Sequence, residues 1–383
     1  MKTLWFLTSV WTLERSLRNK IDKAIPESGA NHSGNGNIIS TPRRIDGRST
    51  CIGALFARAR MPLVLSSTCS NSLARSVKRV FDVVSVGHFS IDSIQLPDKK
   101  SPFVVLGGAA AYVSLAARRL GARVAVVSKV GSDFPEAYRW WLGQEGIDLS
   151  NVSKDDNART TRFELKYSSD LSERSMLSEC RAPPIRIEDL LHVPKAEIIH
   201  IGPIANEIDF DVVQKLKSLA HIVSLDPQGL VRSFDEKGIV TIDPLTDNRV
   251  LGLVDIFKSS LAEIQTITGQ SEISSAVTSI HEYGTKIVVV TLGAKGSVVS
   301  VEGTIHNVPP FTPEKLVDPT GAGDAFMGGF LAEYARGEDS SWCSCVGSAI
   351  ASLVIEGIGP THFGDIDEIY RRARLLYEKG IKE

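Results

Sequence analysis

Short hydrophobic runs alternate with helix-forming segments along the chain from residue 81 onward. The run FDVVSVG at 81–87 is followed by the alanine-rich segment 107–121 and then by ARVAVVSKVG at 122–131. Runs of β-branched residues that close on glycine are typical of buried strands, and alanine favours a helix. The order strand, helix, strand therefore predicts a βαβ unit.

The same rhythm continues towards the C-terminal end. Further strands are expected at 198–204, 221–227, 254–260, 286–293, 297–303 and 304–310, and helices at 209–220, 261–269, 323–336, 341–356 and 365–379. Strands that alternate with helices favour a mainly parallel sheet covered on both faces. We therefore predict an α/β fold, with a doubly wound, mainly parallel sheet and helices on both of its faces.

Two segments, 91–106 and 160–180, break this rhythm. In both, polar and apolar residues alternate and turn residues separate the alternating stretches, which is typical of antiparallel ribbons. Ribbons inserted near the start of a doubly wound sheet would form a small accessory sheet, able to cover a substrate at the carboxyl edge of the main sheet. We therefore expect a small antiparallel β lid.

The chain divides into a basic front and an acidic body. Of its 43 Lys and Arg and its 45 Asp and Glu, residues 1–80 hold 13 and 4, which leaves 30 and 41 for residues 81–383. An acidic body argues against nucleic acid as a partner, because phosphate backbones are bound by clustered Lys and Arg. The five Cys lack the spacing of a disulfide framework, so a reducing compartment and a cytoplasmic protein are expected.

Residues 1–80 show no sustained periodicity, so we place them outside the single domain predicted for 81–383. The apolar stretch 4–13 is much shorter than the roughly 20 residues that span a bilayer. Charged residues follow it in place of a small-residue cleavage site, so neither a membrane partner nor secretion is expected. Three interpretations stay open: a transit segment for an organelle, a disordered extension, or sequence ahead of a later start at Met61.

The sharpest chemical feature is DPTGAGDAF at 318–326, which opens a predicted helix. Gly321, Ala322 and Gly323 leave backbone N–H groups unhindered at the helix start, where the helix dipole favours an anion such as phosphate. Asp324 stands in the first turn beside them, where its carboxylate could accept a proton from an attacking hydroxyl. For a lone GxGD an ordinary helix-start carboxylate would be the better interpretation, but the nine-residue context favours the catalytic one.

This motif resembles the C-terminal signature of the ribokinase-like, or PfkB, carbohydrate kinases. Over about 81–375 the chain is also similar to three other parts of that family: its sugar-binding carboxylate, its paired N-terminal glycines, and its nucleotide strand and turn. The residues at these positions are Asp92, then Gly107 and Gly108, then Thr291, Gly293 and Gly296.

The resemblance implies a ribokinase-like kinase that uses ATP and Mg²⁺ to phosphorylate an alcohol group of a small sugar or polyol. Family members often carry Asn-x-x-Glu to organise Mg²⁺ through water, whereas this chain has Ser260 and Glu263. A hydroxyl can still hydrogen-bond to metal-bound water, so we expect altered affinity rather than lost chemistry. The resemblance further implies a monovalent-cation site, for K⁺, near Asp318 and Thr320, and phosphate contacts from Gly323.

The acceptor is suggested by DPQGLVR at 226–232, which resembles a stretch of the inositol kinases, and by TTRFEL on the predicted lid. Gln228 and Arg232 would hydrogen-bond several hydroxyls of a cyclic polyol; a buried structural pair is the alternative. Arg162 on the lid is a further candidate substrate contact, although a solvated position is the usual one for such a charge. The predicted acceptor is myo-inositol.

Two other functions stay open. One is a ribose, nucleoside or sugar-phosphate kinase on the same scaffold, and the other is a non-catalytic relative that acts as a binding module. Retention of both Asp92 and Asp324 argues against the second, and the Ser260 change is the feature in its favour. The protein is expected to act as a monomer or homodimer on a small-molecule partner.

Overall fold

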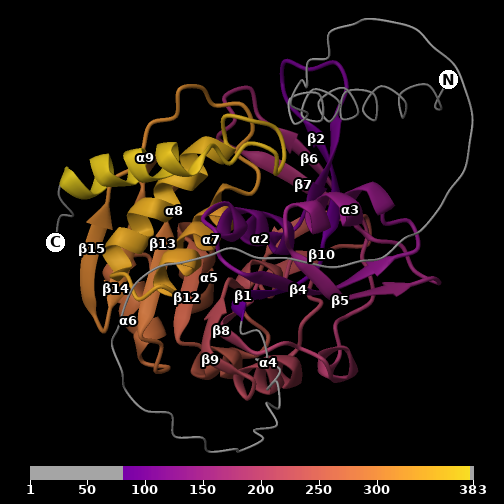
Figure 1. The fold of residues 1–383 in the computed structure, drawn as a ribbon, viewed down its shortest axis with the longest axis horizontal. Coiled ribbons are helices and arrows are strands. Elements are labelled where there is room, and N and C mark those ends of the chain that lie inside the picture. Colours follow the sequence, from indigo (N-terminus) through magenta and orange to yellow (C-terminus); the bar gives the residue numbers. More distant parts are fainter. Residues whose placement is uncertain (1–80, 380–383) are drawn as a thin grey trace, which may run out of the picture. The chain divides into compact units, whose positions relative to one another are not determined.

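A nine-stranded sheet forms the centre of residues 81–379, the part of the chain that the computed structural model describes (Figure 1). The interpretations of residues 1–80 lie outside these residues. In chain order the strands are β1 (Phe81–Val86), β4 (Val124–Gly131), β5 (Asp148–Asp155), β8 (Ala196–Ile201), β9 (Ala220–Leu225), β12 (Ile256–Ser260), β13 (Ile287–Thr291), β14 (Ser297–Val301) and β15 (Thr304–Val308).

The order across the sheet is β15-β14-β13-β12-β9-β8-β1-β4-β5. Pairs from β13 to β5 are parallel, and β14 and β15 add an antiparallel edge. The chain leaves β1 first towards β4 and later returns on its other side through β8. That reversal is the topological switch point of a doubly wound sheet, where ligands bind at the carboxyl ends of the strands.

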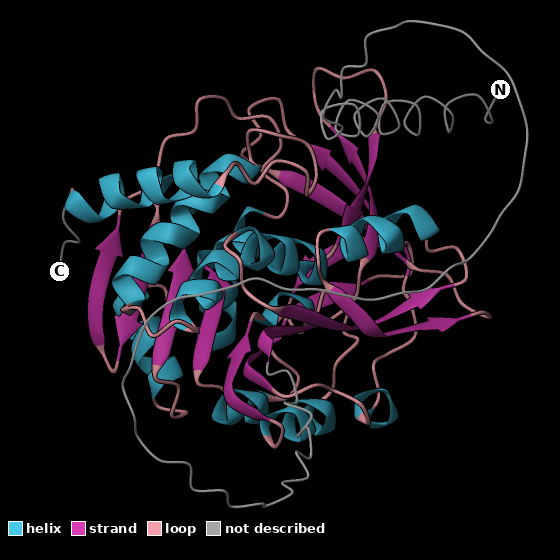
Figure 2. Ribbon diagram, viewed as in Figure 1, coloured by secondary structure: helices cyan, strands magenta, loops and turns pink. Residues whose placement is uncertain are grey.

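Helices cover both faces of this sheet, as predicted (Figure 2). One face packs against α2 (Ala109–Arg119), α3 (Glu136–Gln144), α7 (Ala322–Tyr334), α8 (Ser340–Val354) and α9 (Ile366–Glu378). The other packs against α4 (Phe210–Lys217), α5 (Leu261–Thr268) and α6 (Ile273–His281). The strands are buried on both sides, which explains their continuous Val and Ile runs.

A second sheet stands apart from the first, in the order β3-β2-β6-β7 (Figure 1). Its strands are β2 (Ser90–Gln95), β3 (Phe103–Gly107), β6 (Thr161–Tyr167) and β7 (Arg174–Cys180), so the predicted accessory sheet is confirmed. The hairpins β2–β3 and β6–β7 are antiparallel, and they join through a parallel pair, β2–β6. A short two-stranded ribbon of β10 (Arg232–Phe234) and β11 (Val240–Ile242) was not expected.

The helix α3 and the strand β5 were not predicted either. Each buries little: Leu142 is the buried residue of α3 and Val152 that of β5. Elements at an edge of a sheet need only a narrow apolar stripe, so their periodicity is weak. Among residues 81–379 no helix has the length and apolarity that crossing a membrane would require.

Candidate active site

The start of α7 forms a tight turn that only glycine permits. Gly321 has φ +76°, and a Cβ at this position would lie 2.2 Å from Cε1 of Tyr112. At Gly323 a Cβ would lie 2.8 Å from Nζ of Lys258. Because Gly321 and Gly323 carry no side chains, the backbone amides in the first turn of α7 are unhindered and lie beside a lysine ammonium group. This arrangement suits an anion.

Asp324 stands in that first turn and keeps partial exposure to solvent. Its Oδ1 accepts a hydrogen bond from Nε2 of Gln228 at 3.0 Å. Burial of the carboxyl raises the pKa of Asp324 to about 6, while the positive charge of Lys258 opposes the rise. A carboxyl with that pKa is ionised at neutral pH and is basic enough to take a proton from a hydroxyl.

Lys258 belongs to an ion pair that the sequence analysis did not identify. Its Nζ lies 2.5 Å from Oδ2 of Asp226, and the two side chains are only 6% and 1% exposed. Burial lowers the pKa of Lys258, but the carboxylates of Asp226, Asp324 and Glu263 together outweigh burial and raise the pKa above its ordinary value. The available signal was a lysine inside the strand segment VDIFKSS, because lysine is rarely buried without a partner.

Asp92 and the paired glycines meet where β2 and β3 pair. A Cβ at Gly107 would lie 1.9 Å from Oδ2 of Asp92, and one at Gly108, where φ is +89°, would lie 2.4 Å from the carbonyl oxygen of His88. Asp92 is 5% exposed, and its Oδ1 has no hydrogen-bond partner among the described residues. Burial raises the pKa of Asp92 to about 6. The free oxygen is a ready acceptor for a ligand hydroxyl.

The hydroxyl of Tyr112, on α2, lies within electrostatic reach of both Asp92 and Asp324. Burial raises the pKa of its hydroxyl, and the charges of Asp318, Asp92 and Asp324 raise it further. One buried side chain from α2 is thus within electrostatic reach of carboxylates that are far apart in the sequence. The structure therefore brings Asp92 and Asp324 to the same region, at the carboxyl edge of the main sheet.

The side chains of Gln228 and Arg232 are hydrogen-bonded to each other. Nη2 of Arg232 donates to Oε1 of Gln228 at 2.8 Å, and Nη1 donates to the carbonyl oxygen of Ile204 at 2.7 Å. These donors are engaged within the protein, as in the structural pair considered from the sequence. Since Gln228 also contacts Asp324, the segment DPQGLVR lies next to the candidate base.

The residues expected to face the nucleotide lie on neighbouring strands. Ser260 ends β12 and pairs in register with Thr291, which ends β13. Oγ1 of Thr291 donates to the carbonyl oxygen of Ser259 at 3.3 Å. The turn after Thr291 contains Gly293, with φ +59°, and Gly296, where a Cβ would lie 2.2 Å from the carbonyl oxygen of Val308.

Ser260 and Glu263 form a capping box at the start of α5. Oγ of Ser260 accepts from the backbone N–H of Glu263 at 3.3 Å, and Oε2 of Glu263 accepts from that of Ser260 at 2.7 Å. The pattern Ser-x-x-Glu ahead of an apolar run was the sequence signal for this cap. One carboxylate oxygen of Glu263 is thus committed to the backbone, and its link to Mg²⁺ stays a prediction.

The carboxylate of Asp318 stabilises the turn before α7 by accepting two backbone hydrogen bonds. Its Oδ1 accepts from the backbone N–H of Thr320 at 3.0 Å and its Oδ2 from that of Gly359 at 3.1 Å. Oγ1 of Thr320 lies 2.8 Å from the hydroxyl of Tyr167, on lid strand β6. Within residues 81–379 no three His, Cys, Asp or Glu gather to hold a metal ion. The K⁺ site near Asp318 and Thr320 stays a prediction.

Arg162 lies on the opposite face of β6 from Phe163 and pairs with Asp133, and its role as a substrate contact stays a prediction. Side chains of successive strand residues point to opposite faces, and Phe163, not Arg162, is the register partner of Asp92 in the β2–β6 pair. On the other face, Nη2 of Arg162 lies 2.9 Å from Oδ2 of Asp133. The alternation within TTRFEL could have separated the two faces.

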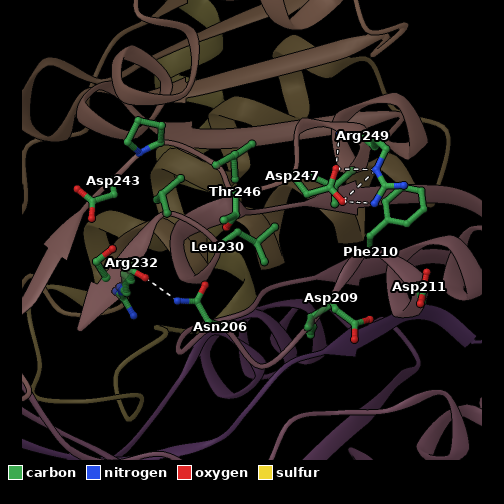
Figure 3. A pocket seen from close by; sticks show the side chains of 16 residues that line it. Asn206, Asp209, Phe210, Asp211, Leu230, Arg232, Asp243, Thr246, Asp247 and Arg249 are labelled. Carbon is green, nitrogen blue, oxygen red and sulfur yellow. Dashed lines mark hydrogen bonds and ion pairs between the residues drawn. The ribbon is translucent and has the colours of Figure 1, made fainter. Parts of the chain in front are cut away.

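A cavity of about 700 Å³ lies beside the ribbon residue Arg232 but includes neither candidate carboxylate (Figure 3). In its wall the guanidinium of Arg249 stacks 4.1 Å from the ring centre of Phe210 and pairs with Asp247 at 2.5 Å. These charges are satisfied by each other. The size of a cavity therefore does not locate the chemistry here, whereas the buried carboxylates and bare glycines do.

Known proteins that are similar to this chain are also kinases. Residues 80–366 match the family described as pfkB family carbohydrate kinase. A cytidine kinase of Thermococcus kodakarensis is 33% identical over 287 residues, which cover 73% of this chain and 98% of that relative. An inositol 3-kinase of Oryza sativa subsp. japonica is 27% identical over 292 residues, which cover 72% of this chain and 68% of that relative.

Among solved structures, a pyrophosphate-dependent kinase in the ribokinase family, complexed with a pyrophosphate analog and myo-inositol, matches with a TM-score of 0.64. The sequence identity is 21%, and the match covers 76% of this chain and 99% of the other. Similarity at that identity supports the fold, which is the ribokinase-like arrangement predicted from the sequence.

Proposed function

The chain belongs to the pfkB family of carbohydrate kinases, and on that premise we propose that it transfers the γ-phosphoryl group of ATP to a hydroxyl of a small sugar, polyol or nucleoside. The observation that carries the proposal is the presence, in one region, of an ionisable Asp324 in the first turn of α7 and an Asp92 whose Oδ1 has no partner among residues 81–379. One carboxylate can orient an acceptor while the other activates it.

In the proposed reaction, Oδ1 of Asp92 accepts a hydrogen bond from one hydroxyl of the acceptor and fixes its position. Asp324 takes the proton of the reacting hydroxyl as its oxygen bonds to phosphorus, and the bond from phosphorus to the β–γ bridging oxygen of ATP breaks. The amides at Gly321–Gly323 and the ammonium of Lys258 face the negative charge on the transferring group. ADP leaves with the bridging oxygen.

The donor side fits a nucleoside triphosphate with a divalent ion. Mg²⁺ prefers phosphate oxygens and water with one or two carboxylates and needs no dedicated protein cage, so a site with few protein ligands suits it. Glu263 is the carboxylate we assign to the water shell of Mg²⁺, which would neutralise phosphate charge when bound. Thr291, Gly293 and Gly296 lie on the neighbouring strand and turn, where a nucleotide would be held.

For the acceptor we propose a ribonucleoside, with cytidine first, because the 33% identical relative that is matched over 98% of its length is a cytidine kinase. myo-Inositol is the second candidate, favoured by the segment DPQGLVR and by the inositol 3-kinase relative. The structural support for myo-inositol is limited, because the guanidinium donors expected to meet its hydroxyls bond to Gln228 and Ile204.

The test is acceptor-dependent release of ADP from ATP, or of phosphate from pyrophosphate as an alternative donor, with cytidine, adenosine, myo-inositol, ribose and fructose 6-phosphate as acceptors. We expect at least one acceptor to stimulate turnover, with the highest kcat/KM for cytidine. The highest value for myo-inositol would support the second candidate. Binding of acceptors without turnover from either donor would contradict the kinase and favour a binding module.

A further inference from the structure

We propose that Gln228 and Arg232 are positioning residues for Asp324: Gln228, held by Arg232, occupies Oδ1 of Asp324 and leaves Oδ2 as the oxygen that accepts the proton. The inference rests on the proposed function, since it assigns the proton-accepting atom of that reaction. It also gives the segment DPQGLVR a role that does not involve contact with the acceptor.

The first step concerns the orientation of the Gln228 amide. Nη2 of Arg232 lies 2.8 Å from one end of the amide, and a guanidinium group can only donate hydrogen bonds. That end must therefore be the carbonyl oxygen, Oε1. The NH₂ end then points to Oδ1 of Asp324, 3.0 Å away.

The second step concerns the two oxygens of Asp324. An NH₂ group can only donate, so Oδ1 has to accept from it. A proton on Oδ1 would compete with that hydrogen bond, whereas a proton on Oδ2 preserves it. When Asp324 takes the proton of the acceptor, the geometry therefore selects Oδ2.

The third step is that Arg232 is itself fixed. Its Nη1 donates to the carbonyl oxygen of Ile204 at 2.7 Å, and its guanidinium carbon lies 5.5 Å from the ring centre of Phe163. Phe163 is the register partner of Asp92 on the lid. The chain of contacts thus runs from the lid sheet through Arg232 and Gln228 to Asp324.

The charged and titratable groups around Asp324 come from several elements. They are Lys258 on β12, Asp226 at the end of β9, Arg232 on β10, Arg174 on β7 and the hydroxyl of Tyr112 on α2. Gln228 adds an uncharged donor that favours the ionised form of the carboxyl. Replacing this donor by a negative charge would favour the protonated form.

The experiment compares Gln228→Glu, Gln228→Met and the control Gln214→Glu, which changes an exposed glutamine on α4. The readout is kcat and acceptor KM as functions of pH. In Gln228→Glu one carboxylate oxygen pairs with Arg232 and the other faces Asp324. We expect the acid limb of the pH profile of kcat to shift to higher pH by about one unit. At a fixed pH on that limb, this shift lowers kcat by about tenfold.

For Gln228→Met we expect a smaller upward shift, for Gln214→Glu no shift, and for all three an unchanged acceptor KM. An acid limb that stays in place in both Gln228 variants would overturn the inference. So would a tenfold rise in acceptor KM at unchanged kcat, because that split would mean that Gln228 binds the acceptor.

A second readout separates this inference from the proposed function. The titration of the Asp324 carboxyl can be followed by carbon NMR, with Asp324→Asn used to assign the signal, and needs no turnover. We expect its pKa to rise in Gln228→Glu and not in Gln214→Glu. An unchanged titration in an active enzyme would defeat the inference alone, whereas a wild-type protein inactive on every acceptor would defeat the proposed function.

Discussion

Nζ of Lys258 lies 2.5 Å from Oδ2 of Asp226, in an ion pair that is almost completely removed from solvent. The same ammonium group lies beside Gly323 at the start of α7. A buried charge is tolerated only with a partner, so the pair keeps a cation fixed where a phosphate would arrive. The pair therefore links the stability of the fold to the chemistry of the site.

The first prediction is that Lys258→Met destabilises the protein by about 3–5 kcal/mol, because it leaves the buried carboxylate of Asp226 without a partner. Urea unfolding measures the change. The control is Lys99→Met, which removes an exposed pair with Asp98 and should change the free energy of unfolding by less than about 1 kcal/mol. Equal changes in the two variants would contradict the structural role of the buried pair.

The second prediction concerns Gly323→Ala. The added Cβ would lie 2.8 Å from Nζ of Lys258, so the ammonium group has to move away from the first turn of α7. We expect kcat/KM for ATP to fall by up to about a hundredfold, since a misplacement of about 1 Å can cost about that much.

Its control is Gly143→Ala in α3, where a Cβ would meet nothing within 4 Å. That variant should keep wild-type kinetics. Because alanine favours a helix over glycine by up to about 1 kcal/mol, Gly143→Ala should not lose stability, whereas Gly323→Ala disturbs the buried Lys258–Asp226 pair and should lose some. Wild-type kinetics in Gly323→Ala would mean that the bare first turn is not used for phosphate.

The main sheet and the lid were predictable because both depend on periodicity. The runs FDVVSVG and ARVAVVSKVG became β1 and β4, and the alternation in 160–180 became β6 and β7. The glycines at 107–108 and 321–323 were also predictable as candidates, since unhindered backbone is encoded directly in the sequence. Asp324 was indicated by the motif DPTGAGDAF and Asp92 by the family resemblance, and their roles remain proposals.

The partners of these residues were not predictable, because they come from segments distant in the sequence. Lys258 meets Asp226 only when β12 lies beside β9. Likewise, the contact of Gln228 with Asp324 joins residues 96 positions apart. The pairing of Arg162 with Asp133 was likewise not indicated by the sequence.

The third prediction concerns pH and stability. The pKa of Asp92 is about 6 in the folded protein and near the ordinary value of about 4 in the unfolded chain. Between these values the folded state binds more protons, so this carboxyl lowers the free energy of unfolding as the pH rises from about 4 to 6. Asp92→Asn should therefore be about 1–3 kcal/mol more stable than the wild type at pH 8.

At pH 4.5 that advantage should nearly vanish, because the carboxyl of Asp92 is then protonated in the folded protein. Urea unfolding at the two pH values measures it. Asp98→Asn, at a position 73% exposed, serves as the control and should show no comparable pH-dependent gain. A gain for Asp92→Asn that is the same at both pH values would rule out titration as its cause.

The fourth prediction is that the lid closes over bound substrates. Asp92 lies on β2, and Tyr167 on β6 contacts Thr320 just before α7, so ligands in the site would touch both hairpins. Amide hydrogen exchange in 91–106 and 160–180 should slow when an acceptor and a nonhydrolysable ATP analogue are added together. Unchanged exchange in both segments would exclude closure of the lid.

The central claim is that the carboxylate of Asp324 accepts the proton of the acceptor, and Asp324→Asn tests it most directly. The amide keeps the shape but cannot take the proton, so kcat with the identified acceptor should fall by about 10²–10⁴-fold. Calorimetric dissociation constants for ATP and the acceptor should stay within a few-fold of wild type. A variant that binds both substrates and keeps the wild-type kcat would contradict the assignment.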